Sequence, residues 1–143
     1  GAASQLIGGG DTLYALSPYD EGSIWRYMGT PDAWVGVGNS GAQFVCAEGN
    51  LYKLSADREE IFQYDGTPYS WTLIGGSASQ LIGSGDTLYT ISSNIVISVW
   101  RYTGTPNVWE RIDSPVKQIL CIGDDVYGLS PDSTSVYHIL DLN

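Results

Sequence analysis

Residues 5–14 read QLIGGGDTLY, and the chain repeats this stretch three more times in varied form. The later copies are QFVCAEGNLY at 43–52, QLIGSGDTLY at 80–89 and QILCIGDDVY at 118–127. Their leading glutamines are 38, 37 and 38 residues apart. A period of this length is typical of modules that stack or form a ring. We therefore predict one domain over residues 1–143. Its repeats are 1–42, 43–79, 80–117 and 118–143.

The third repeat shows the expected strands most clearly. An apolar run at 80–83 ends at a Ser-Gly-Asp turn signal, and 87–92 is rich in β-branched and aromatic residues. Residues 98–102 alternate, with Trp and Tyr on one face and Arg on the other. A Gly-Thr-Pro turn at 104–106 precedes a fourth strand at 108–112. A complete repeat is thus predicted to form four short antiparallel strands.

The fold class follows from this pattern. No stretch shows sustained helical periodicity, so we predict an all-β protein. Four strands in a unit of about 38 residues match a β-propeller blade better than a solenoid coil or a trefoil unit. The last repeat stops after its third strand and is expected to lack the outer one. A single four-bladed ring and a homodimer completing a larger ring both stay open.

Composition limits the classes of partner. Five Trp and ten Tyr within a 43% hydrophobic fraction support a packed core. The 16 acidic residues outnumber the 6 basic ones, and the net charge of −10 repels nucleic acid and anionic lipid. No apolar run approaches the length that membrane insertion needs. Low charge with many Ser, Thr, Asn, Gln and Tyr suits recognition of neutral, hydroxyl-rich ligands.

Catalytic, metal and cofactor chemistry finds little support. The single histidine, His138, occupies an exposed polar position on a strand, and no nucleophile elbow, metalloprotease helix or phosphate loop is present. Asp11 and Asp86 do not follow the spacing of calcium loops. Cys46 and Cys121 share one slot two repeats apart, farther than the 4.4–6.8 Å that a disulfide spans, and are expected to be free, buried thiols. We predict a protein that is not an enzyme and holds no metal or cofactor.

Positions that recur in several repeats are candidates for a repeated ligand site. An unvarying tryptophan three residues after the Gly-Thr-Pro turn either packs at the blade edge or stacks on a ligand. This slot holds Trp34, Trp71 and Trp109. An outward polar slot on the third strand holds Arg26, Gln63 and Arg101. An acidic slot in the first turn holds Asp11, Asp86 and Asp124.

Two further slots and one loop complete the pattern. The leading glutamine either satisfies backbone groups or contacts a ligand, and it occurs as Gln5, Gln43, Gln80 and Gln118. The tyrosine of the second strand is expected in the core between blades, as Tyr14, Tyr52, Tyr89 and Tyr127. The loop between the second and third strands shares little among repeats. It covers 18–23, 56–60, 93–98 and 131–135.

Repeated polar and aromatic slots favour carbohydrate binding. A sugar ring stacks on Trp or Tyr, and its hydroxyls need paired donors and acceptors. Several weak copies of such a site gain strength when clustered glycans engage them together. The sequence therefore predicts a multivalent lectin. The alternative is a protein-interaction scaffold, or a propeller fragment of a larger protein, that uses the variable loops.

The pattern WxxIGG…QLIGxGDxLYxIS…VWRYxGTPxxW also resembles the tectonin and tachylectin-like β-propeller repeats of fungal, bacterial and invertebrate lectins. The resemblance covers essentially the whole chain. It implies binding of glycans or glycoconjugates on cell surfaces, in sites at or between blades. The chain departs from such propellers by its fewer and shorter units and its unfinished last one. No signal peptide can be read from the sequence, and an extracellular or secreted location is the one we favour.

Overall fold

The structure is a computed structural model that describes residues 2–19, 22–84, 86–93, 97–112, 118–122 and 125–140. The chain is all-β, with 55% of its residues in strands, and the described part contains no helix. That part accordingly has no helix able to cross a membrane. The expected all-β class and the four-stranded antiparallel sheets are confirmed.

Each repeat folds as one sheet in which strands pair in sequence order. The first sheet contains β1 (Gln5–Gly9), β2 (Thr12–Leu16), β3 (Ile24–Tyr27) and β4 (Trp34–Gly38). The second contains β5 (Gln43–Ala47), β6 (Asn50–Leu54), β7 (Ile61–Tyr64) and β8 (Trp71–Gly75). The third contains β9 (Gln80–Ser84), β10 (Thr87–Ser93), β11 (Ile97–Tyr102) and β12 (Trp109–Arg111). In the described residues the fourth contains β13 (Gln118–Ile122), β14 (Asp125–Leu129) and β15 (Val136–Leu140).

The Gly-Thr-Pro turn joins the third and fourth strands of each complete sheet. In the second repeat Gly66 has φ 97° and Tyr69 has φ 64°, and the Ser70 backbone N–H donates to the Thr67 carbonyl at 2.9 Å. Pro68 fixes its own φ near the value that the second position of this turn needs. The first and third repeats show the same left-handed positions and the same hydrogen bond. The copied sequence therefore encodes a copied turn.

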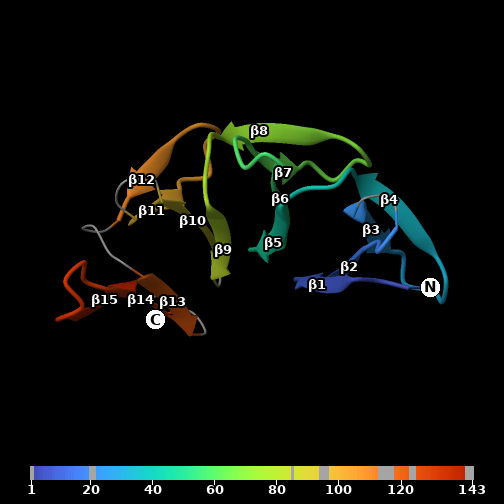
Figure 1. The fold of residues 1–143 in the computed structure, drawn as a ribbon. Coiled ribbons are helices and arrows are strands. Elements are labelled where there is room, and N and C mark those ends of the chain that lie inside the picture. The colour runs from blue at the N-terminus through green and yellow to red at the C-terminus, as the bar shows by residue number, and fades with distance from the viewer. Residues whose placement is uncertain are drawn as a thin grey trace.

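The core lies between neighbouring sheets. Figure 1 shows the first three sheets along an arc, with β1, β5 and β9 toward its inside and β4, β8 and β12 toward its outside. One apolar cluster joins the first and second sheets and another joins the second and third. The tyrosine slot is buried in the first three repeats, as predicted, at Tyr14, Tyr52 and Tyr89. Tyr127 is only half-buried, and its ring stacks on exposed His138 at 4.8 Å.

A hydrogen-bonded joint links the second sheet to the first and the third sheet to the second. The Val37 carbonyl accepts from the Tyr69 backbone N–H at 2.9 Å and from the Trp71 indole Nε1 at 3.0 Å. The Ile74 carbonyl accepts in the same way from Asn107 N and Trp109 Nε1, both at 2.8 Å. The Gly-Thr-Pro turn and its tryptophan thus form one unit that docks on the preceding outer strand.

Small residues make room for that tryptophan. A Cβ on Gly38 would lie 2.8 Å from the Trp71 ring, and one on Gly75 would lie 2.8 Å from Trp109 Nε1. Both distances are shorter than carbon contacts allow, so each tryptophan requires a glycine at the end of the preceding outer strand.

The leading glutamine also acts between sheets. Gln43 Nε2 donates to the Leu81 carbonyl and its Oε1 accepts from the Leu81 backbone N–H, both at 2.8 Å. The amide therefore pairs with β9 of the next repeat as a strand would. At Gln43 the interpretation as a backbone-satisfying residue is confirmed, although the partner is a neighbouring strand instead of a loop.

Cys46 is a free thiol, as predicted, but it is half-buried instead of fully buried. Its burial raises the pKa of the thiol to about 11. A Cβ on Gly9 of the first sheet would lie 2.5 Å from its sulfur. The slot therefore holds a small side chain against the neighbouring inner strand. The side chain of Cys121 lies outside the described residues.

Candidate ligand sites at the two ends of the strands

The candidate residues fall into two groups at opposite ends of the strands. Within each meander, the first turn and the Gly-Thr-Pro turn lie at one end, which we call the turn end. The loop between the second and third strands and the connection to the next sheet lie at the other, the loop end. Pockets at the turn end contain the predicted aspartate, arginine and glutamine side chains, whereas those at the loop end contain the predicted tryptophans.

The most polar of these pockets lies at the turn end between the second and third repeats. It has a volume of about 470 Å³, within the usual range for small-molecule sites. Three predicted residues meet there from two sheets: Gln63 from β7, Asp86 from the turn before β10, and Arg101 from β11. We call it the inter-repeat pocket. Its other main polar lining residues are Glu48, Asn50, Tyr52, Tyr102 and Glu110.

The inter-repeat pocket offers donors and acceptors on all sides. The Arg101 guanidinium forms an ion pair with Glu110, and both side chains are exposed. The rings of Tyr52 and Tyr102 meet edge to face at 6.2 Å. Burial raises the pKa of both tyrosines, and a hydrogen bond with Asn50 opposes that rise at Tyr52. Both phenols therefore keep their protons near neutral pH and can donate as well as accept hydrogen bonds.

The first repeat carries the corresponding half of this pocket. Asp11, Arg26 and Met28 line a volume of about 330 Å³ with residues of the first sheet alone. Arg26 is half-buried, and its Nε has no hydrogen-bond partner in the described part of the chain. Burial raises the pKa of Tyr14 and of Tyr64, while the Arg26 charge opposes both shifts. Asp124, in the same slot as Asp11, lies outside the described residues.

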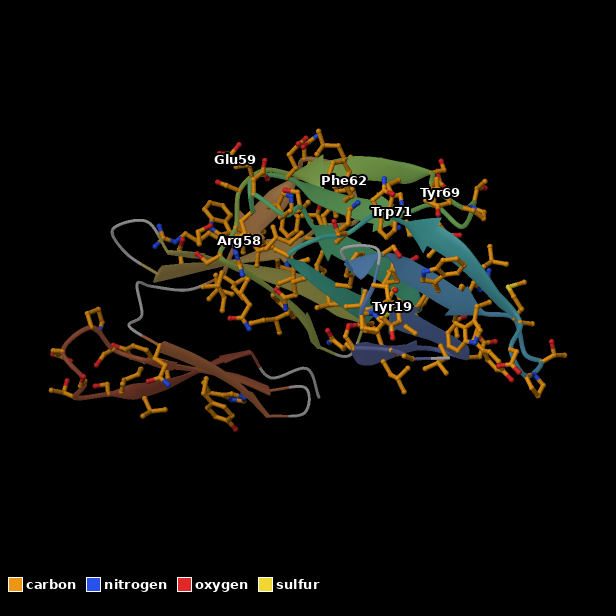
Figure 2. The ribbon with its side chains drawn as sticks, turned by 45° about the vertical axis from the view of Figure 1, so that its right-hand side comes forward. Tyr19, Arg58, Glu59, Phe62, Tyr69 and Trp71 are labelled. Carbon is orange, nitrogen blue, oxygen red and sulfur yellow. The ribbon has the colours of Figure 1, made fainter. Side chains whose placement is uncertain are left out.

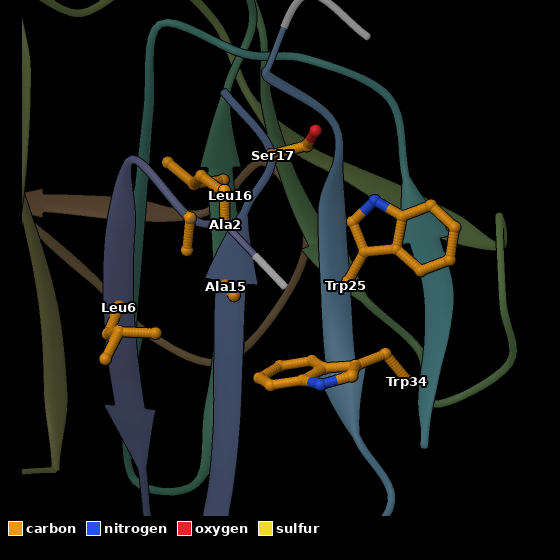
Figure 3. A pocket seen from close by; sticks show the side chains of 8 residues that line it. Ala2, Leu6, Ala15, Leu16, Ser17, Trp25 and Trp34 are labelled. Atoms are coloured by element: carbon orange, nitrogen blue, oxygen red, sulfur yellow. The ribbon is translucent and has the colours of Figure 1, made fainter. Parts of the chain in front are cut away.

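The loop end of the first repeat has an apolar pocket walled by two tryptophans. Trp25 and Trp34 border a volume of about 430 Å³ that Leu6, Ala15 and Ser17 also line (Figure 3). The third repeat has a smaller version of about 180 Å³, lined by Trp100, Trp109 and Thr90 and narrowed by Ile61 of the second sheet. We call these the tryptophan corners.

In the second repeat a lysine occupies the equivalent place. The Lys53 Nζ lies 5.3 Å from the centre of the Phe62 ring and 4.9 Å from that of Trp71. Figure 2 shows the two aromatic residues on the second sheet, with Tyr69 at the turn that docks on the first. Burial lowers the pKa of the Lys53 ammonium. The corner of the second repeat is thus filled from within the chain.

The two interpretations of the recurring tryptophan apply to different parts of the side chain. The indole N–H groups of Trp71 and Trp109 are used in the joints, which is a packing role. Faces of Trp34 and Trp109 nevertheless border corner pockets. Stacking on a ligand stays a prediction for these faces. Any such ligand lies away from the arginine slot, at the other end of the strands.

Sequence reasoning missed several pocket residues. Glu48 and Asn50 line the inter-repeat pocket from the second repeat, although the other repeats carry Gly at the first position and Thr or Asp at the second, so slot recurrence could not find them. Glu110 could have been found from the predicted strand pairing, because it lies opposite Arg101 in the β11–β12 register. Lys53 could have been found in the same way, because it pairs with Phe62 in the β6–β7 register.

Within the described residues, no three His, Cys, Asp or Glu side chains are placed to hold a metal ion. The chain matched no protein-family model and no curated protein. What the pockets bind must therefore be inferred from their own geometry and chemistry.

Proposed function

We propose that the protein is a multivalent, non-enzymatic lectin whose glycan sites lie at the turn end between adjacent repeats. The observation that carries this proposal is the inter-repeat pocket, where Gln63, Asp86 and Arg101 meet from two sheets. These side chains were selected from repeated sequence slots, and they share one pocket of about 470 Å³.

The chemistry of the pocket suits a neutral polyhydroxylated ligand. Carboxylates, an amide, a guanidinium and two phenols give a mixture of donors and acceptors, which vicinal hydroxyls require. The buried Tyr52 and Tyr102 rings border the pocket beside those groups. The Glu110 carboxylate is paired with Arg101, which offsets the positive charge that an anionic ligand would need.

The repeat supplies the valency. We propose that the sheets are the blades of a β-propeller, because β1, β5 and β9 contact one another in series and each joint has the same hydrogen bonds. A site built at one junction then has counterparts at others. The half-pocket with Asp11 and Arg26 is such a counterpart. Weak contacts at several junctions add up on clustered surface glycans.

We further propose that a second copy of the chain covers the first sheet and completes a larger ring. The first sheet leaves Leu6 63% exposed, whereas Phe44 and Leu81 in the same slot are buried by the preceding sheet. On the fourth sheet Val136 is 71% exposed, whereas Ile61 in that slot is buried by the following sheet. The two uncovered faces are therefore the opposite halves of one type of junction. Joining them would complete the half-pocket of Asp11 and Arg26.

A glycan array tests the lectin proposal. The wild-type protein is expected to bind a subset of neutral glycans, and free sugar should compete. Gln63→Ala and Asp86→Ala should each weaken binding about tenfold, because each removes a hydrogen-bonding group from the pocket. Glu59→Ala, an exposed change at the loop end, is the matched control and should bind as the wild type does. A folded protein that binds nothing on a broad array would refute the proposal.

Light scattering tests the second copy. We expect a mass of twice 15.4 kDa, and Leu6→Asp should return the protein to one chain because a charge cannot be buried in that face. Leu73→Asp, at an exposed apolar residue of β8, serves as control. A wild-type mass of 15.4 kDa at all concentrations would instead support closure within a single chain or no closure at all.

A further inference from the structure

Lys53 shows what kind of group a corner between these aromatic residues accommodates. Its ammonium lies within about 6 Å of two ring centres, the range of cation–π attraction. The side chain belongs to β6, next to Phe62 on β7, and reaches over to Trp71 on β8. The second repeat therefore holds a primary ammonium group against two aromatic faces, with the lysine stem acting as its tether.

The first and third repeats keep the aromatic walls and remove the tether. Ala15 and Thr90 stand at the Lys53 position, and both border open corner pockets. Trp25 takes the place of Phe62 in the first repeat, and Trp100 takes it in the third. Tryptophan presents a stronger face to a cation than phenylalanine does. The open corners thus carry better cation-binding walls than the filled one.

The residue that packs against the lysine stem also differs between the filled corner and the open ones. Gly41 leaves room for the lysine stem, since a Cβ there would lie 2.7 Å from Lys53 Cγ. Gly41 stands two residues before Gln43, and the equivalent residues before Gln5 and Gln80 are Ala3 and Ala78.

The open corners also hold their tryptophans by a hydrogen bond that the filled corner does not have. Trp25 Nε1 donates to Ser23 Oγ at 3.0 Å, and Trp100 Nε1 donates to Ser98 Oγ at 3.2 Å. The second repeat has Glu60 at the serine position and a phenylalanine without an N–H. The corners therefore come in two forms, one filled by lysine and one open with anchored tryptophans.

We propose that the two open tryptophan corners bind a small organic cation, an alkylammonium group that takes the place Lys53 takes in the second repeat. Trp25 and Trp34 form one site, and Trp100 and Trp109 form the other. A net charge of −10 attracts such a cation toward the protein. These sites lie at the loop end, away from the inter-repeat pocket, and take a ligand class other than neutral glycans.

Titration with choline, followed through the indole N–H signals in a ¹H–¹⁵N spectrum, tests this assignment. The chain has five tryptophans, so all five signals can be followed separately. Trp25, Trp34, Trp100 and Trp109 should shift, while Trp71 stays in place because Lys53 fills its corner. The neutral isostere 3,3-dimethylbutan-1-ol is the ligand control. Choline should bind about threefold to thirtyfold more tightly, the range that cation–π attraction gives. n-Butylammonium, which copies the lysine side chain, should move the same signals.

Two variants exchange the open and filled forms. Lys53→Ala should open the middle corner, so that Trp71 joins the signals that choline moves. Ala3→Gly/Ala15→Lys should fill the first corner as Gly41 and Lys53 fill the second, and Trp34 should then stop responding while Trp109 still does. Chemical-shift dispersion of the remaining amides reports whether each variant is folded.

The proposal is overturned if the neutral isostere moves the same signals with equal affinity, or if choline moves no indole signal of the folded protein. It is also overturned if wild-type Trp71 responds as strongly as Trp34. These outcomes leave the lectin proposal untouched, because that proposal is tested by the Gln63 and Asp86 variants, which lie at the turn end.

Discussion

The first and third sheets present almost the same residues to the repeat that precedes them, yet their burial differs. Leu81 is 1% exposed and Leu6 is 63% exposed, although both follow the leading glutamine of their repeat. Leu88 and Leu13 differ in the same direction. The second sheet packs on this face of the third sheet. In the described residues no sheet packs on the same face of the first, whose other face meets the second sheet. The repeat thus encodes an apolar surface that a neighbouring repeat buries, as in other repeat proteins.

Truncating the two leucines gives the largest expected difference. Leu81→Ala should destabilise the fold by about 3 kcal/mol, because it opens a cavity in the core between the second and third sheets. Leu6→Ala should cost about 0.5 kcal/mol or less in a single chain, since its side chain is already in contact with water. Urea unfolding of both variants measures the difference. Equal losses at low protein concentration would mean that the first face is covered after all.

Adding a methyl group at the joint between the second and third sheets is expected to give the next largest loss of stability. Gly75→Ala should cost about 2 kcal/mol, because the new Cβ overlaps the Trp109 ring, which its hydrogen bond to Ile74 holds in place. Gly76→Ala is the matched control, since nothing lies within 4 Å of a Cβ there. Thermal unfolding of the two variants should show a lower melting temperature for the first only. A silent Gly75→Ala would indicate that the joint is loose.

Removing the indole donor while keeping an aromatic ring has a smaller effect. Trp109→Phe should cost about 1 kcal/mol, because the Ile74 carbonyl keeps only the Asn107 N–H. Trp34→Phe should be close to neutral, since the structure describes no sheet before the first one to accept its bond. The comparison is made by urea unfolding at equal protein concentration. A loss at Trp34 as large as that at Trp109 would contradict the assigned joint.

The smallest expected effect on stability concerns the loop between the second and third strands, which has the same turn in the second and fourth repeats. Loops 55–60 and 130–135 share the same turn, with Arg58 and Ser133 at φ 62° and 63°. In the first of them the Arg58 carbonyl accepts from the backbone N–H of Ala78, in the connection that leads to β9, at 3.1 Å. In the second, hydrogen bonds from Thr134 and Ser130 lower the pKa of Asp132 to about 2.

A group whose pKa is lower in the folded chain stabilises the fold above its unfolded pKa of about 3.9 and loses that contribution as the pH falls toward 2. Unfolding midpoints between about pH 5 and pH 2 should therefore fall less steeply for Asp132→Asn than for the wild type. Parallel profiles would show that the Asp132 hydrogen bonds do not form in solution.

Much of the fold could be read from the sequence because its signals are local. Alternation around Trp100 and the Gly-Thr-Pro turns predicted the strands of the third repeat to within two residues. The buried tyrosine slot was also predictable, since a tyrosine amid apolar neighbours on a short strand has few other places to go. Tyr127 departs from the pattern because the described residues of the fourth repeat offer it His138 as a stacking partner and no following sheet.

The sites were harder to predict because each is made by two repeats or by two ends of one sheet. The sequence grouped Trp109 with Arg101, but the meander separates them to pockets at opposite ends. Glu48 and Asn50 enter the inter-repeat pocket through the packing of the second sheet on the third. The expected variability of the loops also hid a shared turn, although Ser-x-Asp at 55–57 and 130–132 was a signal for it.

The central proposal is that junctions between repeats act as several glycan sites at once, and agglutination measures this most directly. The wild-type protein should agglutinate cells or beads bearing a glycan identified on the array, and the free monovalent sugar should reverse it. Gln63→Ala/Asp86→Ala should raise the concentration needed by at least about tenfold, while Glu59→Ala should not change it. Binding of the glycan without agglutination at any protein concentration would contradict the proposal, because it would leave a single site per particle.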